Sequence, residues 1–173
     1  MLPFEQGGLD SLCGIYSLVN AERTINHTTV EESQALFDSI VEYLDDQDIL
    51  ASILKSTGGM LLKHIKAIIV DVIGDRIPYQ RLHFAGVANP DLNTFWTEME
   101  SFLSAKSRRA VLLGISGVHD HWTVIKEISE KRIELFDSDC LCRINRINCT
   151  TAEVKGRRHH VLYPAQTYFL GSA

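Results

Sequence analysis

Apolar residues in the first part of the chain recur every three or four positions, the spacing of helices that bury one face. This pattern predicts a first helix from Ser11 to Arg23, with Asp10 or Ser11 as its N-cap. A second helix is expected to begin near Thr29, where Glu32 three residues later completes a capping box. Shorter helices are predicted over positions 48–54, over positions 60–72 and, capped by Asn93 or Thr94, up to about position 106.

From Arg109 onward the pattern changes to short apolar runs bounded by turn residues, which are typical of strands. Strands are predicted over positions 110–115, 121–128, 132–136, 143–147, 160–163 and 167–170. Positions 77–87, which contain Pro78 and Gly86, are expected to be extended or irregular. Helices followed by antiparallel strands predict an α+β fold. We expect a single domain over residues 1–173, in which a helical part (1–107) packs on a C-terminal antiparallel sheet (108–173).

Charge and composition narrow the function classes. The 173 residues carry a formal net charge of −5, and they lack the clustered basic surplus of a nucleic-acid binder. The longest apolar-rich segment, Ile65 to Ile73, is interrupted by Lys66 and Asp71 and is shorter than the roughly 20 residues of a membrane span. Four cysteines are too few for a disulfide scaffold of this length, and no secretory leader is visible. A reduced, cytoplasmic protein is expected.

Cys13 is the sharpest chemical feature, because the predicted helix places it in a first turn, after a glycine-containing loop. A helix N-terminus stabilises a thiolate, the nucleophilic form of cysteine. Gln6 can fold back over the loop and, with the Cys13 backbone N–H, hold the oxyanion of a tetrahedral intermediate. Gly14 would let a substrate backbone approach. The alternative for Cys13 is a small buried hydrophobe in an amphipathic helix.

His121 and Asp137 form a second constellation. His121 begins a predicted strand and Asp137 follows the end of the next, so both are expected at the same edge of the sheet. A carboxylate there can accept a hydrogen bond from the far ring nitrogen of the histidine and support it as a base for Cys13. His119 competes with His121, because alternation along a strand places both on one face. We favour His121, which begins the regular apolar strand.

The residues Gln6, Cys13, His121 and Asp137, in that order, resemble the motifs of the papain-like cysteine peptidase superfamily. The Cys-Gly pair and the His-aromatic-x-Val strand are similar to those of the bacterial peptidases that process double-glycine leader peptides. The resemblance implies a papain-like fold with an N-terminal catalytic helix. It implies Cys13 as nucleophile, His121 as general base, Asp137 as its orienter and Gln6 as oxyanion donor. Those leader peptidases usually have an aspartate directly before the cysteine, where this chain has Leu12.

Several activities fit such a site. A thiol hydrolase that cleaves a peptide or isopeptide bond is favoured, with a peptide or protein as its substrate. A substrate containing Gly-Gly would suit Gly14 and a narrow site closed by Trp122. A glutamine deamidase or transglutaminase-type acyl transferase would use the same acyl-thioenzyme, and a catalytically silent binding module on the same fold is a further alternative. The oligomeric state stays open.

A zinc site is the remaining alternative. Its candidate ligands are Cys140, Cys142, Cys149, His159 and His160. Their spacing does not match the usual ligand pairs separated by two to four residues, so neither a metal nor a cofactor is expected.

Overall fold

The computed structural model describes residues 1–7, 11–56, 59–87, 90–152 and 156–172. The helices in these ranges are α1 (Cys13–Asn26), α2 (Val30–Asp46), α3 (Leu50–Lys55), α4 (Leu62–Ile68) and α5 (Leu92–Ala105), with the short turns η1 (Ile69–Ile73), η2 (Gly74–Arg76) and η3 (Arg146–Asn148). The strands are β1 (Tyr79–Arg81), β2 (Arg109–Gly117), β3 (His121–Ile128), β4 (Arg132–Leu135), β5 (Arg143–Asn145), β6 (Cys149–Thr150) and β7 (His160–Gly171). The predicted α+β class is confirmed.

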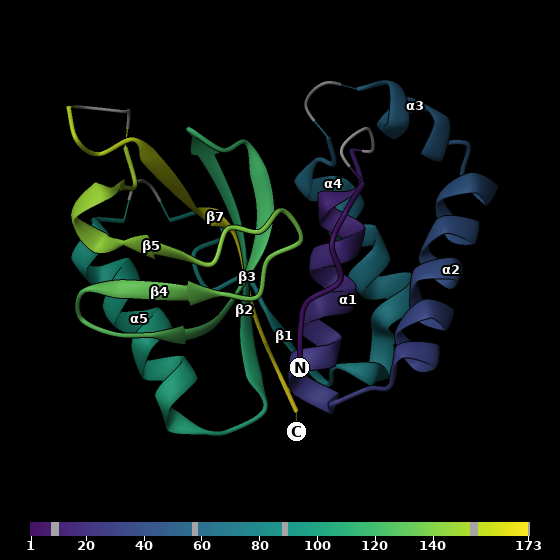
Figure 1. Ribbon diagram of the computed structural model, residues 1–173, viewed down its shortest axis with the longest axis horizontal. Coiled ribbons are helices and arrows are strands. Elements are labelled where there is room, and N and C mark those ends of the chain that lie inside the picture. Colours follow the sequence, from purple (N-terminus) through teal and green to yellow (C-terminus); the bar gives the residue numbers. More distant parts are fainter. Residues whose placement is uncertain (8–10, 57–58, 88–89, 153–155, 173) are drawn as a thin grey trace.

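One sheet lies between two layers of helix (Figure 1). Its strand order is β1-β7-β2-β3-β4-β5, and β6 pairs with β7 outside this path. The helices α1 to α4 lie on one side of the sheet and α5 on the other. The sheet is not wholly antiparallel as expected, because β6 runs parallel to β7. The segment expected only to be extended contributes β1, which pairs with β7 and brings the end of the helical part into the sheet.

The central strand β2 explains why two helical layers are needed. Ala110 and Leu112 belong to the core beneath α1 to α4, whereas Val111 and Leu113 belong to the core beneath α5. Successive strand residues point to opposite faces, so an unbroken apolar run leaves no face suited to water. The apolar run that predicts this strand therefore also requires that helices cover both faces of the sheet.

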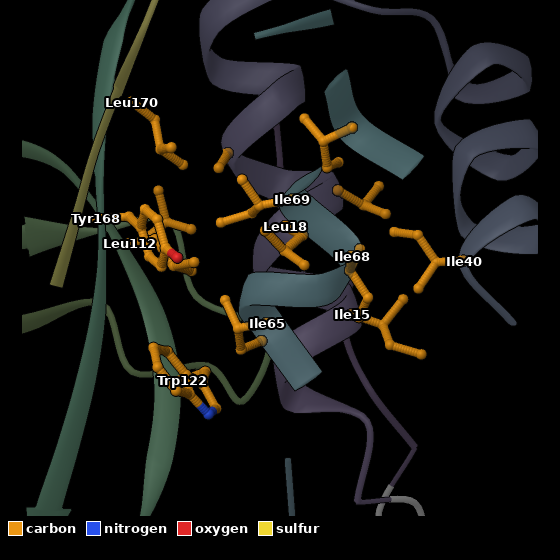
Figure 2. Packing of buried hydrophobic residues seen from close by; sticks show 14 of the residues in the cluster. Ile15, Leu18, Ile40, Ile65, Ile68, Ile69, Leu112, Trp122, Tyr168 and Leu170 are labelled. Carbon is orange, nitrogen blue, oxygen red and sulfur yellow. The ribbon is translucent and has the colours of Figure 1, made fainter. Parts of the chain in front are cut away.

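Helix α1 is the buried centre of the larger helical layer (Figure 2). Ile15 and Leu18 are fully buried. Polar residues on α1 are buried too, and each makes a specific hydrogen bond. The Ser17 hydroxyl donates to the Trp122 carbonyl of β3 at 2.7 Å. The Asn20 side chain accepts from the Phe4 N–H at 2.8 Å and donates to the Phe4 carbonyl, which fixes the N-terminal segment on the helix.

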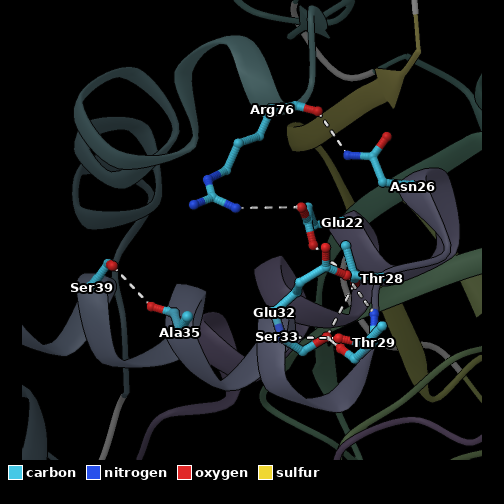
Figure 3. A network of polar contacts seen from close by, with 9 residues as sticks. All are labelled: Glu22, Asn26, Thr28, Thr29, Glu32, Ser33, Ala35, Ser39 and Arg76. Carbon is cyan, nitrogen blue, oxygen red and sulfur yellow. Dashed lines mark hydrogen bonds and ion pairs between the residues drawn. The ribbon is translucent and has the colours of Figure 1, made fainter.

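A buried carboxylate joins the end of α1 to its neighbours (Figure 3). Glu22, 2% exposed, accepts a hydrogen bond from the Thr28 hydroxyl at 3.1 Å, and its other oxygen lies 3.8 Å from the Arg76 guanidinium. The Asn26 amide donates to the Arg76 carbonyl at 2.8 Å. These contacts hold the start of α2 and the turn η2 against the C-terminal end of α1.

Some predicted boundaries differ from the structure. Asp91 caps α5 in place of Asn93 or Thr94, and its carboxylate accepts the N–H groups of both. The strands predicted over 160–163 and 167–170 are one strand, β7, whose register against β2 shifts between Leu113 and Ile115. Pro164 has no N–H to donate to a neighbouring strand, which agrees with an irregularity at this point. The helix predicted over 60–72 begins at Leu62 and ends in the π-helical turn η1.

No helix in the described ranges is both long and apolar enough to cross a membrane.

The predicted capping box of α2 is present and gives a stability test. The Thr29 hydroxyl accepts the Glu32 N–H at 3.2 Å, and the Glu32 carboxylate accepts the Thr29 N–H at 2.8 Å. Thr29→Ala removes the acceptor, so we expect the free energy of unfolding to fall by about 1 kcal/mol in urea titrations. Thr29→Ser keeps the hydroxyl and should stay near wild type. Equal losses in both variants would contradict the capping role.

Candidate active site

Cys13 is the first residue of α1, and packing rather than a side-chain cap fixes its position. Leu12 occupies the N-cap, and within the described part of the chain no side chain caps this helix. The predicted cap at Ser11 is wrong, because its hydroxyl donates to the Ser56 carbonyl at 2.9 Å. The alternative cap, Asp10, lies outside the described residues. An uncapped helix start presents backbone N–H groups and a partial positive charge beside Cys13.

His121 and Asp137 lie in contact at the ends of two neighbouring strands. His121 is the first residue of β3, and Asp137 follows the end of β4 by two residues. A hydrogen bond from the Phe136 N–H to the Val124 carbonyl, 2.8 Å, holds the chain against β3 just before Asp137. The Nε2 atom of His121 lies 3.0 Å from Oδ2 of Asp137, and the two side chains are 7% and 1% exposed.

The Asp137 carboxylate is held from both sides. Its Oδ1 accepts the N–H groups of Asp139 at 2.8 Å and Leu141 at 3.2 Å, which leaves Oδ2 for His121. Burial acts to raise the pKa of Asp137, but the hydrogen bond and the charge of His121 outweigh it and keep the pKa below its usual value. The carboxylate is therefore both ionised and fixed in orientation.

His121 connects this carboxylate with the thiol. Burial acts to lower the pKa of His121, but hydrogen bonds to Asp137 and to the Cys13 side chain, with the negative charges on both, raise the pKa to about 10. Because Nε2 faces Asp137, Nδ1 is the nitrogen left for the sulfur. At neutral pH the ring is therefore a protonated imidazolium between two acidic groups.

The structure separates the two competing histidines. The ring of His119 stacks on that of His160, with centroids 5.8 Å apart and planes 1° from parallel. His159 lies against His160 in turn, at 4.6 Å. His121 contacts Asp137 and the Cys13 thiol, whereas His119 belongs to this second group of rings.

Gln6 is placed beside the Asp137 segment by its main chain. Its N–H donates to the Ser138 carbonyl at 2.9 Å. Its Oε1 is buried and accepts no hydrogen bond from the described residues. The structure thus brings Gln6 to the residue after Asp137. A contact between its amide and the surroundings of the thiol is not among the described hydrogen bonds, and oxyanion binding by Gln6 stays a prediction.

A cavity of about 240 Å³ opens beside Cys13 and His121. The side formed by the helical part consists of Met60, Leu61 and Leu62. The remaining lining residues come from the sheet and its loops: Gly114, Ile115, Asp120, Trp122, Tyr163 and Gln166. The thiol and the imidazole therefore face a space between the two parts of the chain, where a substrate can reach them.

Sequence reasoning missed the segment that forms the helical wall. A Cβ atom built on Gly59 would lie 3.9 Å from Cys13 Sγ, and the Trp122 indole N–H donates to the Met60 carbonyl at 2.7 Å. Gly59 has a φ of +61°, which glycine adopts without strain. The sequence pattern predicts only a helix break here. The signal in the sequence that could have indicated this wall is Gly59 followed by the apolar residues Met60 to Leu62.

The predicted role of Gly14 is wrong. A Cβ on Gly14 would lie 2.8 Å from both Ile65 Cδ1 and Met60 Sδ, so this residue faces the core beneath α4. Its lack of a side chain lets α1 approach that helix closely, and it opens no space for a substrate. Gly14 therefore gives no support to a Gly-Gly substrate.

The other cysteines do not contribute to the cavity. Cys140 and Cys142 are exposed, and Cys149 is buried in the core beneath α5, where burial raises the pKa of its thiol to about 12. All four thiols are free. Among the residues that the structure describes, no three His, Cys, Asp or Glu side chains gather as a metal site would require.

Comparison with known proteins returns no match for this chain, whether with family models, curated proteins or solved structures. Function must therefore be argued from the geometry of the site.

The pairing of His121 with Asp137 predicts that the free energy of unfolding depends on pH. The pKa of this imidazole is about 10 in the folded protein against an ordinary 6.5. A raised pKa stabilises the fold fully below pH 6.5, and the contribution is lost as pH rises toward 10. As pH rises from 6.5 to 10, the free energy of unfolding of wild type should fall relative to that of His121→Gln, by at most about 1.4 kcal/mol per pH unit.

Urea titrations at several pH values measure this difference. His27→Asn is the matched control, because His27 is exposed and has a φ of +57°, which asparagine tolerates. Its stability should follow that of wild type across the range. Parallel pH profiles for wild type and His121→Gln would rule out a charged His121 in the folded protein.

Proposed function

We propose that this chain is a papain-like thiol hydrolase that cleaves a peptide or isopeptide bond. Cys13 is its nucleophile, His121 its acid and base, and Asp137 the residue that positions His121. The observation that carries the proposal is the position of the buried imidazole, which contacts a fixed carboxylate on one side and the Cys13 side chain on the other. Support also comes from the cavity, which gives a substrate access to both reacting groups.

The first step forms an acyl-thioenzyme. With His121 protonated, the Cys13 sulfur reacts as a thiolate. It attacks the carbonyl carbon, so a carbon–sulfur bond forms and the carbonyl electron pair moves to oxygen. Backbone N–H groups at the uncapped start of α1 are suited to that oxyanion. We assign the second donor to the Gln6 amide. The intermediate then collapses, the carbon–nitrogen bond breaks, and His121 gives its proton to the leaving amine.

The second step releases the acid. His121, now neutral, takes a proton from a water molecule as the water oxygen attacks the thioester carbon. Collapse of this intermediate expels the Cys13 thiolate, and the proton on His121 restores the starting ion pair. One water is consumed for each bond cleaved. Asp137 stays ionised throughout, because two backbone N–H groups stabilise its charge and His121 keeps an Nε2–H facing it in both protonation states.

Thiol labelling tests the proposal directly. An electrophilic peptide probe should modify Cys13 faster than Cys140 or Cys142, although Cys13 is buried and these two are exposed. His121→Ala should slow labelling of Cys13 by about a hundredfold at pH 6, because the variant lacks the cation that stabilises the thiolate, the reactive form of cysteine. Mass spectrometry of peptide digests gives the rate at each cysteine.

The variants separate catalysis from simple exposure. Cys13→Ser should abolish labelling at position 13 and peptide hydrolysis, while labelling of Cys140 and Cys142 continues. Asp137→Asn keeps the shape of the carboxylate and should lower the rate less than His121→Ala. If Cys13 reacts no faster than the exposed cysteines, the chain is a binding module on this fold, and the hydrolase proposal fails.

A further inference from the structure

The cavity beside Cys13 has two unlike walls. The helical side is apolar, formed by Met60, Leu61 and Leu62, and Leu61 is 55% exposed. An exposed leucine at the entrance of a cavity offers apolar surface to an incoming chain. The opposite side carries polar groups from the sheet and its loops, together with the apolar Ile115 and Trp122. A side chain that enters between the two sides therefore meets hydrocarbon on both, and hydrogen-bonding groups on the sheet side.

Asp120 is a charged residue of this cavity without a partner among the residues that the structure describes. It lies in the loop just before β3 and is exposed, and no hydrogen bond or ion pair to it occurs within the described residues. Its neighbour His121 does not neutralise it, because that imidazole is already paired with Asp137. No lysine or arginine is among the lining residues that the structure describes. In its described lining, the cavity therefore presents the negative charge of Asp120 with no lysine or arginine to neutralise it.

The neutral polar groups are placed around the same space. A Cβ atom on Gly114 would lie 2.9 Å from Oε1 of Gln166, so the Gln166 amide lies over the bare backbone of β2. The Tyr163 hydroxyl lies 2.7 Å from that of Ser116. Amide and hydroxyl oxygens can accept hydrogen bonds from a cation that Asp120 attracts.

We propose that this cavity selects substrates with a lysine or arginine side chain beside the scissile bond, and that Asp120 determines this specificity. The inference rests on the proposed hydrolase function. Lysine and arginine combine an apolar stem with a charged end, which matches the two walls. The volume of about 240 Å³ is below the roughly 300–1,000 Å³ of pockets for whole drug-sized ligands, so it suits one side chain of a peptide. An acidic side chain would meet the Asp120 charge and be rejected.

Three chloroacetamides that differ only in the end of their tail test the selectivity. The reactive group and the spacer are identical, and the tail ends in an ammonium, an acetamide or a carboxylate. The rate of Cys13 labelling by each is measured by mass spectrometry. In wild type the ammonium probe should react about two- to fivefold faster than the acetamide probe, as expected for one partly exposed charge pair. The carboxylate probe should be the slowest.

Asp120→Asn should bring the ammonium-to-acetamide rate ratio close to one. Asp75→Asn removes the same charge from an exposed position in η2 and should keep the wild-type ratio. This control separates a local effect from the overall negative charge of the protein. Added salt should reduce the wild-type ratio, because it screens exposed charges.

The outcomes distinguish the two proposals. A fast reaction of Cys13 with no preference among the tails, or a preference that persists in Asp120→Asn, overturns the specificity inference and leaves the hydrolase proposal intact. A reaction of Cys13 no faster than that of Cys142 with all three probes overturns the hydrolase proposal and this inference with it. A preference lost in Asp120→Asn but kept in Asp75→Asn supports both.

Discussion

The packing of α1 against β3 is the constraint on which the site depends. Cys13 belongs to the helix and His121 to the strand, so only this packing brings sulfur and imidazole together. Trp122 fixes the contact from two sides. Its carbonyl accepts the Ser17 hydroxyl of α1 at 2.7 Å, and its indole N–H donates to the Met60 carbonyl, also at 2.7 Å. Trp122, the residue after His121, therefore holds both the helix that carries Cys13 and the Met60 side of the cavity.

Burial of the site has a cost that the surrounding backbone offsets. Removing a charged histidine and aspartate from water is unfavourable unless their mutual attraction is joined by further hydrogen bonds. Asp137 gains two of these from the Asp139 and Leu141 N–H groups, because the chain turns directly after β4. The N–H of Asp139 in this turn adds to the larger effect of His121, whose hydrogen bond and charge keep the pKa of Asp137 below its usual value despite burial. The fixed, ionised carboxylate of Asp137 can then keep the His121 imidazole protonated next to a thiol.

Local signals explain what the sequence could reveal. The α2 capping box, the uninterrupted run of β2 and the strand starting at His121 each depend on residues close together in the chain, and each is present. The errors concern contacts across the fold. Ser11 bonds Ser56 instead of capping α1, Gly14 faces Ile65, and Met60 reaches Trp122 over 62 residues. No periodicity within α1 or β3 encodes those partners, so the walls of the cavity could not be predicted although its central residues could.

Asp137 and Asp120 both lie near His121, but their environments differ. Asp137 is buried, hydrogen-bonded through both oxygens and fixed toward His121. Asp120 is next to His121 in sequence, yet it is exposed and lines the cavity without an ion-pair partner among the described residues. The first carboxylate has no freedom to meet a substrate, and the second does not hold the imidazole in the described contacts. Because the two groups share no hydrogen bond among the described contacts, the selection of a basic side chain that we propose for Asp120 is physically separable from the activation of the thiol that we propose for Asp137 and His121.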